Sequence, residues 1–317
     1  MKVFLTGAAG FIGYHTAKSL LDEAHEVYGF DSINDYYDPF YKQLRLKQLA
    51  AYKNFSFTQG FLEDAEGLGK AYKNFCPTHV VHLAAQAGVR YSIENPQAYI
   101  SANIVGFQNL IELVRQTTVL ENFVYASSSS VYGNNKTLPF SETQDVANPI
   151  SLYAATKIAN ELVAKSYSHL YQIPSTGLRF FTVYGPYGRP DMALFSFTQK
   201  ILRGEPIPVF NYGKMTRDFT YIDDIVRGIR AALYKAQQGQ IYNLACGRQE
   251  NLMHMVDLLE RKLGKTAQRK LMPLQAGDVP VTSADISKAQ QDLDYKPGVS
   301  IDQGLPQFVE WYLATHS

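Results

Sequence analysis

Short apolar segments alternate with longer segments of helical periodicity through the first 180 residues. The apolar segments are VFL (3–5), EVYGF (26–30), NFSFT (54–58), HVVHLA (79–84) and NFVYAS (122–127). They lack polar alternation, which is typical of parallel strands covered on both faces. A sixth segment, STGLRFF (175–181), follows a predicted helix over about residues 149–171. The pattern predicts an α/β fold with a doubly wound parallel sheet.

The regular alternation of apolar and helix-like segments ends after residue 182. The segment GPYGRPDMA (185–193) is rich in turn residues, and glycine and proline then recur at irregular intervals. We therefore expect a first domain over residues 1–182, to which segments near 215–250 return. Residues 183–317 should form mainly a smaller mixed α/β lobe over the carboxyl edge of the sheet.

Composition narrows the class of ligand. The 317 residues are 46% apolar and 19% charged, and 30 basic against 29 acidic residues leave a net charge of +1. No run of basic residues indicates nucleic acid or a membrane surface, so a small ligand is favoured. Cys76 and Cys246 lie far apart without metal-ligand spacing, and we expect both to be reduced and buried. With no export signal or long apolar run in view, the sequence predicts a cytoplasmic protein without metal.

A glycine-rich turn follows the first predicted strand. In TGAAGFIG (6–13), Gly7, Gly10 and Gly13 precede a helix-like run, where small residues let a pyrophosphate approach backbone N–H groups at a helix N-terminus. Asp31 ends the second predicted strand, about 20 residues later, where a carboxylate would bind ribose hydroxyls. These features predict a Rossmann domain. Because an acid at Asp31 repels a 2′-phosphate, NAD is favoured over NADP.

Further motifs carry a family resemblance. The glycine spacing GxxGxxG and the YxxxK motif of Tyr153 to Lys157 resemble the extended short-chain dehydrogenases/reductases that act on nucleotide sugars. HLAAQAGVRYS (82–92), LRFFTVYGPYGRPDMA (178–193) and AGDVPVTSADISKA (276–289) extend the likeness over nearly the whole chain. Within that family, DSINDYYDP (31–39) and GKMTRDFTYIDDI (213–225) look like the UDP-glucuronate 4-epimerases.

The resemblance implies a catalytic group. Tyr153 and Lys157 are one helical turn apart and share a helix face. A neighbouring ammonium favours a phenolate, so Lys157 can make Tyr153 a base, and Ser128 would share the substrate proton. The resemblance further implies contacts with NAD from Gly7, Gly10, Phe11, Ile12, Gly13, Asp31, Asn34, Leu62, Leu83, Ala84, Ala85, Asn103, Ser127, Tyr153, Lys157 and Phe180.

Four consecutive serines, Ser127 to Ser130, end the fifth predicted strand. Ser127 would lie against the nicotinamide, where its small size matters more than its hydroxyl. The related 4,6-dehydratases carry acidic residues in this stretch, and their absence here argues against elimination of water. Neutral donors at Ser129, Ser130 and Thr182 instead suit a sugar carboxylate.

The diphosphate end of the substrate requires cations. The resemblance nominates Arg90, Arg189 and Arg217 for the phosphates, Val209, Phe210 and Asn211 for the uracil, and Asp278 for the ribose. Two positions depart from relatives. Phe61 replaces an adenine-binding Asp, so apolar packing is expected there, and Gln275 replaces the phosphate-binding Arg of galactose epimerases.

Three functions remain open at this point. The favoured one is 4-epimerisation between UDP-glucuronate and UDP-galacturonate through a transient 4-keto sugar with tightly bound NAD. The alternatives are a 4-epimerase of UDP-glucose or a UDP-N-acetylhexosamine, and a catalytically silent NAD-binding sensor or scaffold. The resemblance also implies a homodimer formed by helices near residues 96–118 and 150–171.

Overall fold

The computed structural model describes residues 1–235, 238–275 and 277–316. Its centre is a sheet of seven parallel strands in the order β11-β6-β5-β4-β1-β2-β3. The strands are β1 (Lys2–Thr6), β2 (Glu26–Asp31), β3 (Phe55–Gln59), β4 (His79–His82), β5 (Asn122–Ser128), β6 (Ser175–Phe180) and β11 (Gln240–Leu244). The chain therefore forms the doubly wound Rossmann sheet that the apolar segments predict.

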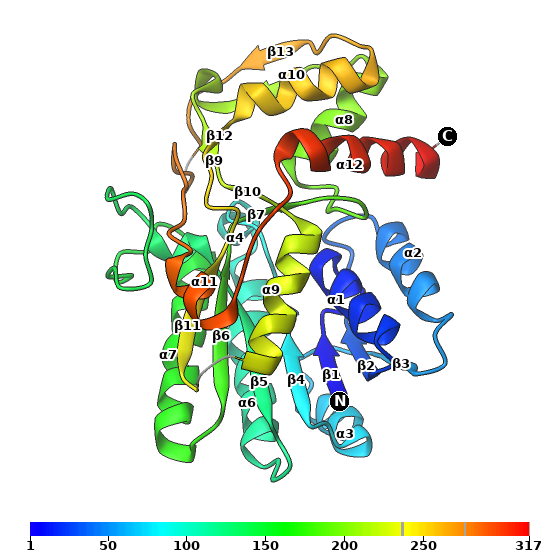
Figure 1. Cartoon of the computed structure of the whole chain (residues 1–317), viewed down its shortest axis with the longest axis vertical. Helices are drawn as coiled ribbons and strands as arrows, with labels where there is room; N and C mark the ends of the chain where they lie inside the picture. Colours follow the sequence, from blue (N-terminus) through cyan, green and yellow to red (C-terminus); the bar gives the residue numbers. More distant parts are fainter. Residues whose placement is uncertain (236–237, 276, 317) are drawn as a thin grey trace.

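Helices cover both faces of this sheet (Figure 1). One face carries α1 (Phe11–Asp22), α2 (Phe40–Leu49), α9 (Ile222–Lys235) and α11 (Ser287–Leu293). The other carries α3 (Ala65–Phe75), α6 (Gly106–Arg115) and α7 (Leu152–Tyr171). An apolar core lies on each face of the sheet, and alternate residues of β1 pack in the two cores. Val3 and Leu5 pack in one core, and Phe4 packs in the other. This explains why the strands read as continuous apolar runs.

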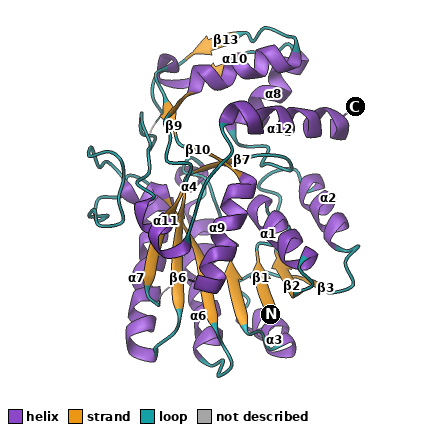
Figure 2. Ribbon diagram, viewed as in Figure 1, coloured by secondary structure: helices purple, strands orange, loops and turns teal. Residues whose placement is uncertain are grey.

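A smaller body lies beyond the carboxyl ends of the strands (Figure 2). It has its own apolar core, which includes Phe195, Ile207, Met255 and Phe308. Its elements are α8 (Ala193–Arg203), β8 (Ile207–Val209), α10 (Leu252–Leu263), β13 (Arg269–Leu271) and α12 (Ile301–His316). Short pairs connect the two bodies: β7 (Thr182–Tyr184) with β10 (Phe219–Tyr221), and β9 (Thr216–Arg217) with β12 (Glu250–Asn251). The chain thus crosses between the bodies several times.

Short helices complete the side of the sheet near α7. They are α4 (Tyr91–Glu94), α5 (Pro96–Tyr99) and the π-helical turn η1 (Ile100–Val105), which leads into α6. Two 3-10 turns are also present: η2 (Ser129–Tyr132) directly after β5, and η3 (Phe210–Gly213) after β8. The serine stretch therefore spans the end of β5 and the start of η2.

Two local expectations differ from the structure. Cys76 is exposed rather than buried, because it lies just past α3 with a left-handed φ of 52°, at the surface end of that helix. Cys246 is buried as expected. Helix α7 begins at Leu152 rather than near residue 149, because the Ser151 hydroxyl accepts a hydrogen bond from the Ala154 N–H and caps the helix there. Ala276, the first residue of the motif 276–289, lies outside the described residues.

Candidate active site

A cavity of about 470 Å³ opens at the carboxyl ends of the strands, beside β1 and β4. The strand order reverses at this point, where doubly wound sheets bind their ligands. The cavity brings together most of the predicted cofactor and catalytic residues, as well as Arg189. Those that line it are Gly7, Gly10, Phe11, Ile12, Gly13, Asp31, Asn34, Leu62, Leu83, Ala84, Ala85, Ser127, Ser128, Tyr153, Lys157, Phe180 and Arg189.

The glycine turn leaves space for a ligand at the start of α1. Gly7 has a φ of 77°, and a Cβ there would lie 2.8 Å from the carbonyl carbon of Leu83. A Cβ on Gly13 would lie 1.9 Å from the Gly7 oxygen, so a side chain is excluded from both positions. The glycines therefore let the turn pack closely on α1 and β4, and they line the cavity at the N-terminus of α1, an arrangement that fits the pyrophosphate of a dinucleotide.

Asp31 ends β2 inside the cavity. Its carboxylate accepts hydrogen bonds from the N–H groups of Ala9, at 3.0 Å, and Ile33, at 2.9 Å. Burial raises the pKa of Asp31, and these bonds and the ammonium of Lys42 oppose the rise. Lys42 is itself buried and donates to the backbone oxygen of Asn34 at 2.7 Å. The pair fits the hydroxyls of an adenosine ribose, with Asp31 as acceptor and Lys42 as donor.

Tyr153 and Lys157 lie in the first two turns of α7, and both line the cavity. The Lys157 ammonium donates to the backbone oxygen of Ala126 on β5 at 3.0 Å. Burial lowers the pKa of Lys157 to about 8, while the nearby Glu161 raises it. Lys157 therefore changes between its charged and neutral forms close to neutral pH.

The Tyr153 side chain is partly buried. Burial raises its pKa, whereas a hydrogen bond with Ser128 and the positive charge of Arg189 lower it. Behind this group, His82 on β4 bonds Thr6 at 2.8 Å, and burial lowers the pKa of His82 to about 3. His82 is thus a neutral core residue, as its place inside a strand predicts, and Tyr153 is the base candidate.

The four serines have different surroundings. Ser127 is buried and donates to the Glu161 carboxylate at 2.5 Å, so its hydroxyl has a partner that the emphasis on its small size did not foresee. The Ser128 hydroxyl donates to the Ser130 hydroxyl and accepts from the Ser130 N–H, both at 3.2 Å. Ser129 begins η2. Ser127 and Ser128 therefore line the cavity that holds Tyr153, whereas Ser129 and Ser130 follow them in η2 outside its lining.

Arg189 brings the segment after β7 to the main cavity, whereas Thr182 of β7 lies outside its lining. Arg189 binds Asp191 through two donors, at 3.0 and 2.5 Å, and the Tyr36 hydroxyl donates to the same carboxylate at 3.1 Å. A smaller cavity of about 40 Å³ contains Thr182 and shares Arg189 with the main one. The loop after β2 thereby contacts the segment after β7 across the opening.

Apart from Arg189, the residues predicted for the nucleotide end do not line the main cavity. The Arg90 guanidinium stacks 4.8 Å over the ring of Phe210, and Arg217 lies 3.5 Å from Asp278. Val209 ends β8, and Asn211 lies in η3 with a left-handed φ of 50°. Asn103 bonds Gln86 and Thr156 rather than lining the cavity.

Several cavity residues were not predicted from the sequence. Lys42, Tyr36, Tyr91 and Gln86 line it. Phe61, where apolar packing with adenine was expected, also lines the cavity and is half-exposed. The DYYDP stretch was noted without a role, and no local pattern marks Lys42. Glu161, which lies behind the wall, could have been found, because it continues the four-residue spacing of Tyr153 and Lys157 along α7.

The described residues, 1–235, 238–275 and 277–316, contain neither a candidate metal site nor a candidate membrane-spanning helix. No group of His, Cys, Asp and Glu side chains among them could hold a metal ion. No helix among them is long and apolar enough to cross a membrane.

Comparisons with known proteins agree with this geometry. Residues 3–245 match the model of the NAD dependent epimerase/dehydratase family. The chain is 49% identical to "Protein CapI" of Staphylococcus aureus over 99% of this chain and 98% of that protein. It is 46% identical to UDP-glucuronate 4-epimerase 4 of Arabidopsis thaliana, over 100% of this chain and 76% of the relative.

A solved structure has the same architecture throughout. UDP-glucuronic acid 4-epimerase of Bacillus cereus, in complex with UDP-glucuronic acid and NAD, superposes with a TM-score of 0.94 and is 36% identical, covering 99% of this chain and 100% of that one. The chain therefore belongs to the NAD dependent epimerase/dehydratase family.

Proposed function

We propose that this protein is a UDP-glucuronate 4-epimerase, which interconverts UDP-glucuronate and UDP-galacturonate with tightly bound NAD. One observation carries the proposal: Tyr153 lines a dinucleotide-sized cavity together with Ser127 and Ser128, which begin a stretch that offers hydroxyl groups where the related 4,6-dehydratases carry acidic residues. The relatives named as UDP-glucuronate 4-epimerases support the choice of sugar.

The residues of the chain have separate parts in this reaction. Bound NAD would accept a hydride from carbon 4 of the sugar and return it to the opposite face. Tyr153 removes the proton of the 4-hydroxyl and later restores it, with Ser128 holding the oxygen. Lys157 stabilises the phenolate as a cation and binds the nicotinamide ribose. The 4-keto sugar must turn over between the two steps, so the site has to bind it without fixing the ring.

A sugar acid adds a second requirement. A ketone at carbon 4 and a carboxylate on carbon 5 make a β-keto acid, which loses carbon dioxide when the breaking bond stands perpendicular to the carbonyl plane. Ser129, Ser130 and Thr182 would hold the carboxylate near that plane and thereby slow the loss. Their neutral donors bind the anion without fixing it as tightly as a paired charge would.

The remaining assignments complete the binding mode. Arg90, Arg189 and Arg217 would bind the diphosphate, Val209, Phe210 and Asn211 the uracil, and Asp278 the uridine ribose. Residues 1–182 with the segments near 215–250 would act as the NAD-binding domain, and residues 183–317 mainly as the UDP-sugar lobe. The return of α9 and β11 to the central sheet supports this division.

We further propose that the protein acts as a cytoplasmic homodimer. Apolar side chains are exposed on adjoining helical segments, with exposures of 43% for Val105 at the end of η1 and 60% for Leu162 on α7. A dimer that buries this face would remove them from water. The two unpaired cysteines are compatible with a reducing compartment.

Substrate choice tests the proposal. Purified protein is incubated, without added cofactor, with UDP-glucuronate, UDP-glucose and UDP-N-acetylglucosamine in parallel, and the sugars are separated. We expect UDP-galacturonate from the first and little product from the others. Tyr153→Phe serves as the matched control, because it keeps the ring and the cofactor but removes the base. Preferred turnover of a neutral sugar would reject the uronate assignment, and no turnover of any sugar would favour a silent sensor.

A further inference from the structure

We propose that Glu161 is a positioning residue for the catalytic pair, which holds the end of β5 through Ser127 and keeps Lys157 positively charged. Arg179 on β6 would hold the Glu161 carboxylate in place for this task. The inference rests on the proposed function, because it assigns a part to Glu161 in the proton transfer by Tyr153.

The spacing along α7 places Glu161 behind the catalytic residues. Tyr153, Lys157 and Glu161 follow one another at intervals of four, so they form a row along one side of the helix. Lys157 and Glu161 are both buried. The Glu161 carboxylate accepts the Ser127 hydroxyl at 2.5 Å, while the Lys157 ammonium donates to the oxygen of Ala126. Both side chains of α7 therefore hold the last residues of β5, which line the cavity.

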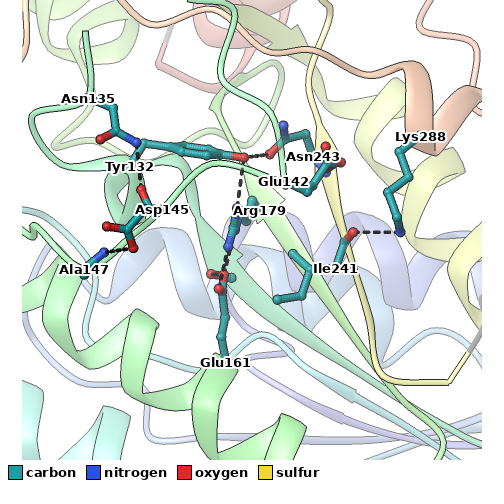
Figure 3. Close-up of polar contacts among 11 residues, drawn as sticks. Tyr132, Asn135, Glu142, Asp145, Ala147, Glu161, Arg179, Ile241, Asn243 and Lys288 are labelled. Carbon is teal, nitrogen blue, oxygen red and sulfur yellow. Dashed lines mark hydrogen bonds and ion pairs between the residues drawn. The ribbon is translucent and has the colours of Figure 1, made fainter. Parts of the chain in front are cut away.

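Arg179 fixes the carboxylate from the neighbouring strand. Its Nε and Nη2 atoms donate to the two Glu161 oxygens at 2.8 and 2.7 Å, a bidentate pair in a buried place. Figure 3 shows the guanidinium between Glu161 and Tyr132, whose hydroxyl accepts from Arg179 at 3.0 Å and donates to Asn243 at 2.7 Å. Asn243 lies on β11, so the network joins α7 to three strands of the sheet.

The network addresses a specific difficulty of the catalytic pair. Lys157 can stabilise a phenolate only while it carries its proton, and burial works against that charge. Glu161 opposes burial, since its carboxylate raises the pKa of Lys157. If Lys157 lost its proton before Tyr153 did, the phenolate would have no neighbouring ammonium.

Other charged or titratable groups face the pair from the surrounding elements. His82 on β4 faces Lys157 and is neutral, because burial lowers its pKa to about 3. Arg189, from the segment after β7, faces Tyr153 as a cation. The ring of Tyr99 in α5 lies edge-on to the ring of Tyr153, with 6.0 Å between the ring centroids. Tyr125 of β5 faces Glu161, and burial raises the pKa of that phenol. Among these groups, Glu161 supplies the negative charge beside Lys157.

Three variants separate charge from packing. Glu161→Gln removes the charge and keeps an acceptor for Ser127. Glu161→Met combined with Arg179→Met removes both charges, and such apolar replacement of a buried ion pair is often neutral for stability. Ser127→Ala cuts the hydrogen bond and leaves the charge. Each is measured by thermal unfolding and by ultraviolet difference titration of the Tyr153 phenolate in the NAD-loaded protein without sugar, with the corresponding Tyr153→Phe protein as blank.

The sign of the expected effect follows from the charges. Without Glu161, Lys157 is less readily protonated, so the Tyr153 phenolate forms at higher pH. We expect its titration, and the acidic limb of kcat/KM for UDP-glucuronate, to rise by about one pH unit or more in Glu161→Gln and in the double variant. Ser127→Ala should titrate within a few tenths of a unit of the wild type, because its carboxylate remains.

If Glu161→Gln does not fold, the Glu161→Met/Arg179→Met variant tests whether Glu161 positions the catalytic pair. Wild-type stability with a raised phenolate titration supports positioning, whereas wild-type stability with an unchanged titration shows that the pair is structural only and overturns the inference. Glu161→Gln with an unchanged titration overturns it as well. Because the titration needs no sugar, it tests the role of Glu161 even if UDP-glucuronate is not turned over. Absence of turnover would reject the proposed function alone.

Discussion

At the residue scale, the hydroxyl groups of Ser129, Ser130 and Thr182 are the ones that we propose to bind the sugar carboxylate. Ser128 and Ser130 are linked to each other, and Thr182 reaches the neighbouring cavity from β7. If these hydroxyls keep the carboxylate near the carbonyl plane, removing one releases carbon dioxide from the keto intermediate. We expect Ser130→Ala or Thr182→Val to raise the fraction of UDP-pentose among the products several-fold, measured by chromatography.

The matched control for this effect is Ser141→Ala, which removes an exposed loop hydroxyl that bonds Thr143. It should leave the product ratio unchanged. Equal pentose fractions in all variants and the wild type would contradict the assigned grip on the carboxylate.

The charge of Lys157 sets a second residue-scale expectation. Burial lowers the pKa of Lys157 to about 8, so the ammonium is lost as the pH rises through that value. Since the phenolate needs this cation, kcat/KM should fall on the alkaline side with a midpoint near pH 8. In Lys157→Arg the guanidinium does not titrate in this range, so the remaining activity should lack the alkaline limb. An identical limb in both proteins would assign it to another group.

Residue roles differed in how far the sequence could reveal them. Tyr153, Lys157, the glycine turn and Asp31 were predictable because each lies in a short motif whose spacing reflects a helix turn or a strand end. Lys42 was not predictable, because it reaches the cavity from α2, and its hydrogen bond to Asn34 depends on how the loop between β2 and α2 folds. Ser127 was interpreted by size alone, since its partner Glu161 is 34 residues away.

At the scale of elements, a buried carboxylate anchors the start of α9. Asp224 is fully buried and accepts hydrogen bonds from the N–H groups of Gly298 and Val299, and it also pairs with Arg227. Asp224→Ala would leave two backbone donors without this acceptor. We expect it to lower the free energy of unfolding by about 3 kcal/mol, measured by urea denaturation.

Asp223 provides a matched control one residue away, because its side chain is exposed. Asp223→Ala should change the free energy of unfolding by less than about 0.5 kcal/mol. Similar losses in both variants would contradict a specific anchoring role for Asp224.

Strands were better predicted than the ends of helices and the turns. Each of the six predicted strands exists. Strands such as β1 and β4 are buried on both faces and need an unbroken apolar run, whereas β3 at the sheet edge is only partly buried. The start of α7 was displaced by the capping hydroxyl of Ser151, a short-range effect that helical periodicity does not register. The exposure of Cys76 likewise follows from the turn that ends α3.

At the scale of the whole molecule, the sheet order follows from the alternation of strands and helices, but the placement of the smaller body does not. That body depends on short pairs such as β8 with β13, which joins residues 207–209 to residues 269–271. Such strands are too short to leave a periodic signal. The nucleotide-binding assignments to Arg90 and Arg217 therefore rested on resemblance rather than on pattern.

The proposed dimer gives a prediction at the same scale. Val105→Glu combined with Leu162→Glu would place two charges on the exposed apolar face of η1 and α7. We expect this double variant to be monomeric by light scattering and the wild type to be dimeric, because burying unpaired carboxylates is costly. Leu313→Glu, on the exposed side of α12, is the control and should stay dimeric. Equal masses for all three proteins would contradict this interface.

The account depends above all on a hydride that leaves carbon 4 and returns to it. UDP-glucuronate that carries deuterium at carbon 4 tests this directly when it is turned over in ordinary water and the product is analysed by mass spectrometry and NMR. The account predicts that UDP-galacturonate retains the deuterium at carbon 4, because Tyr153 moves only the hydroxyl proton. Product in which solvent hydrogen has replaced the deuterium at carbon 4 would contradict it.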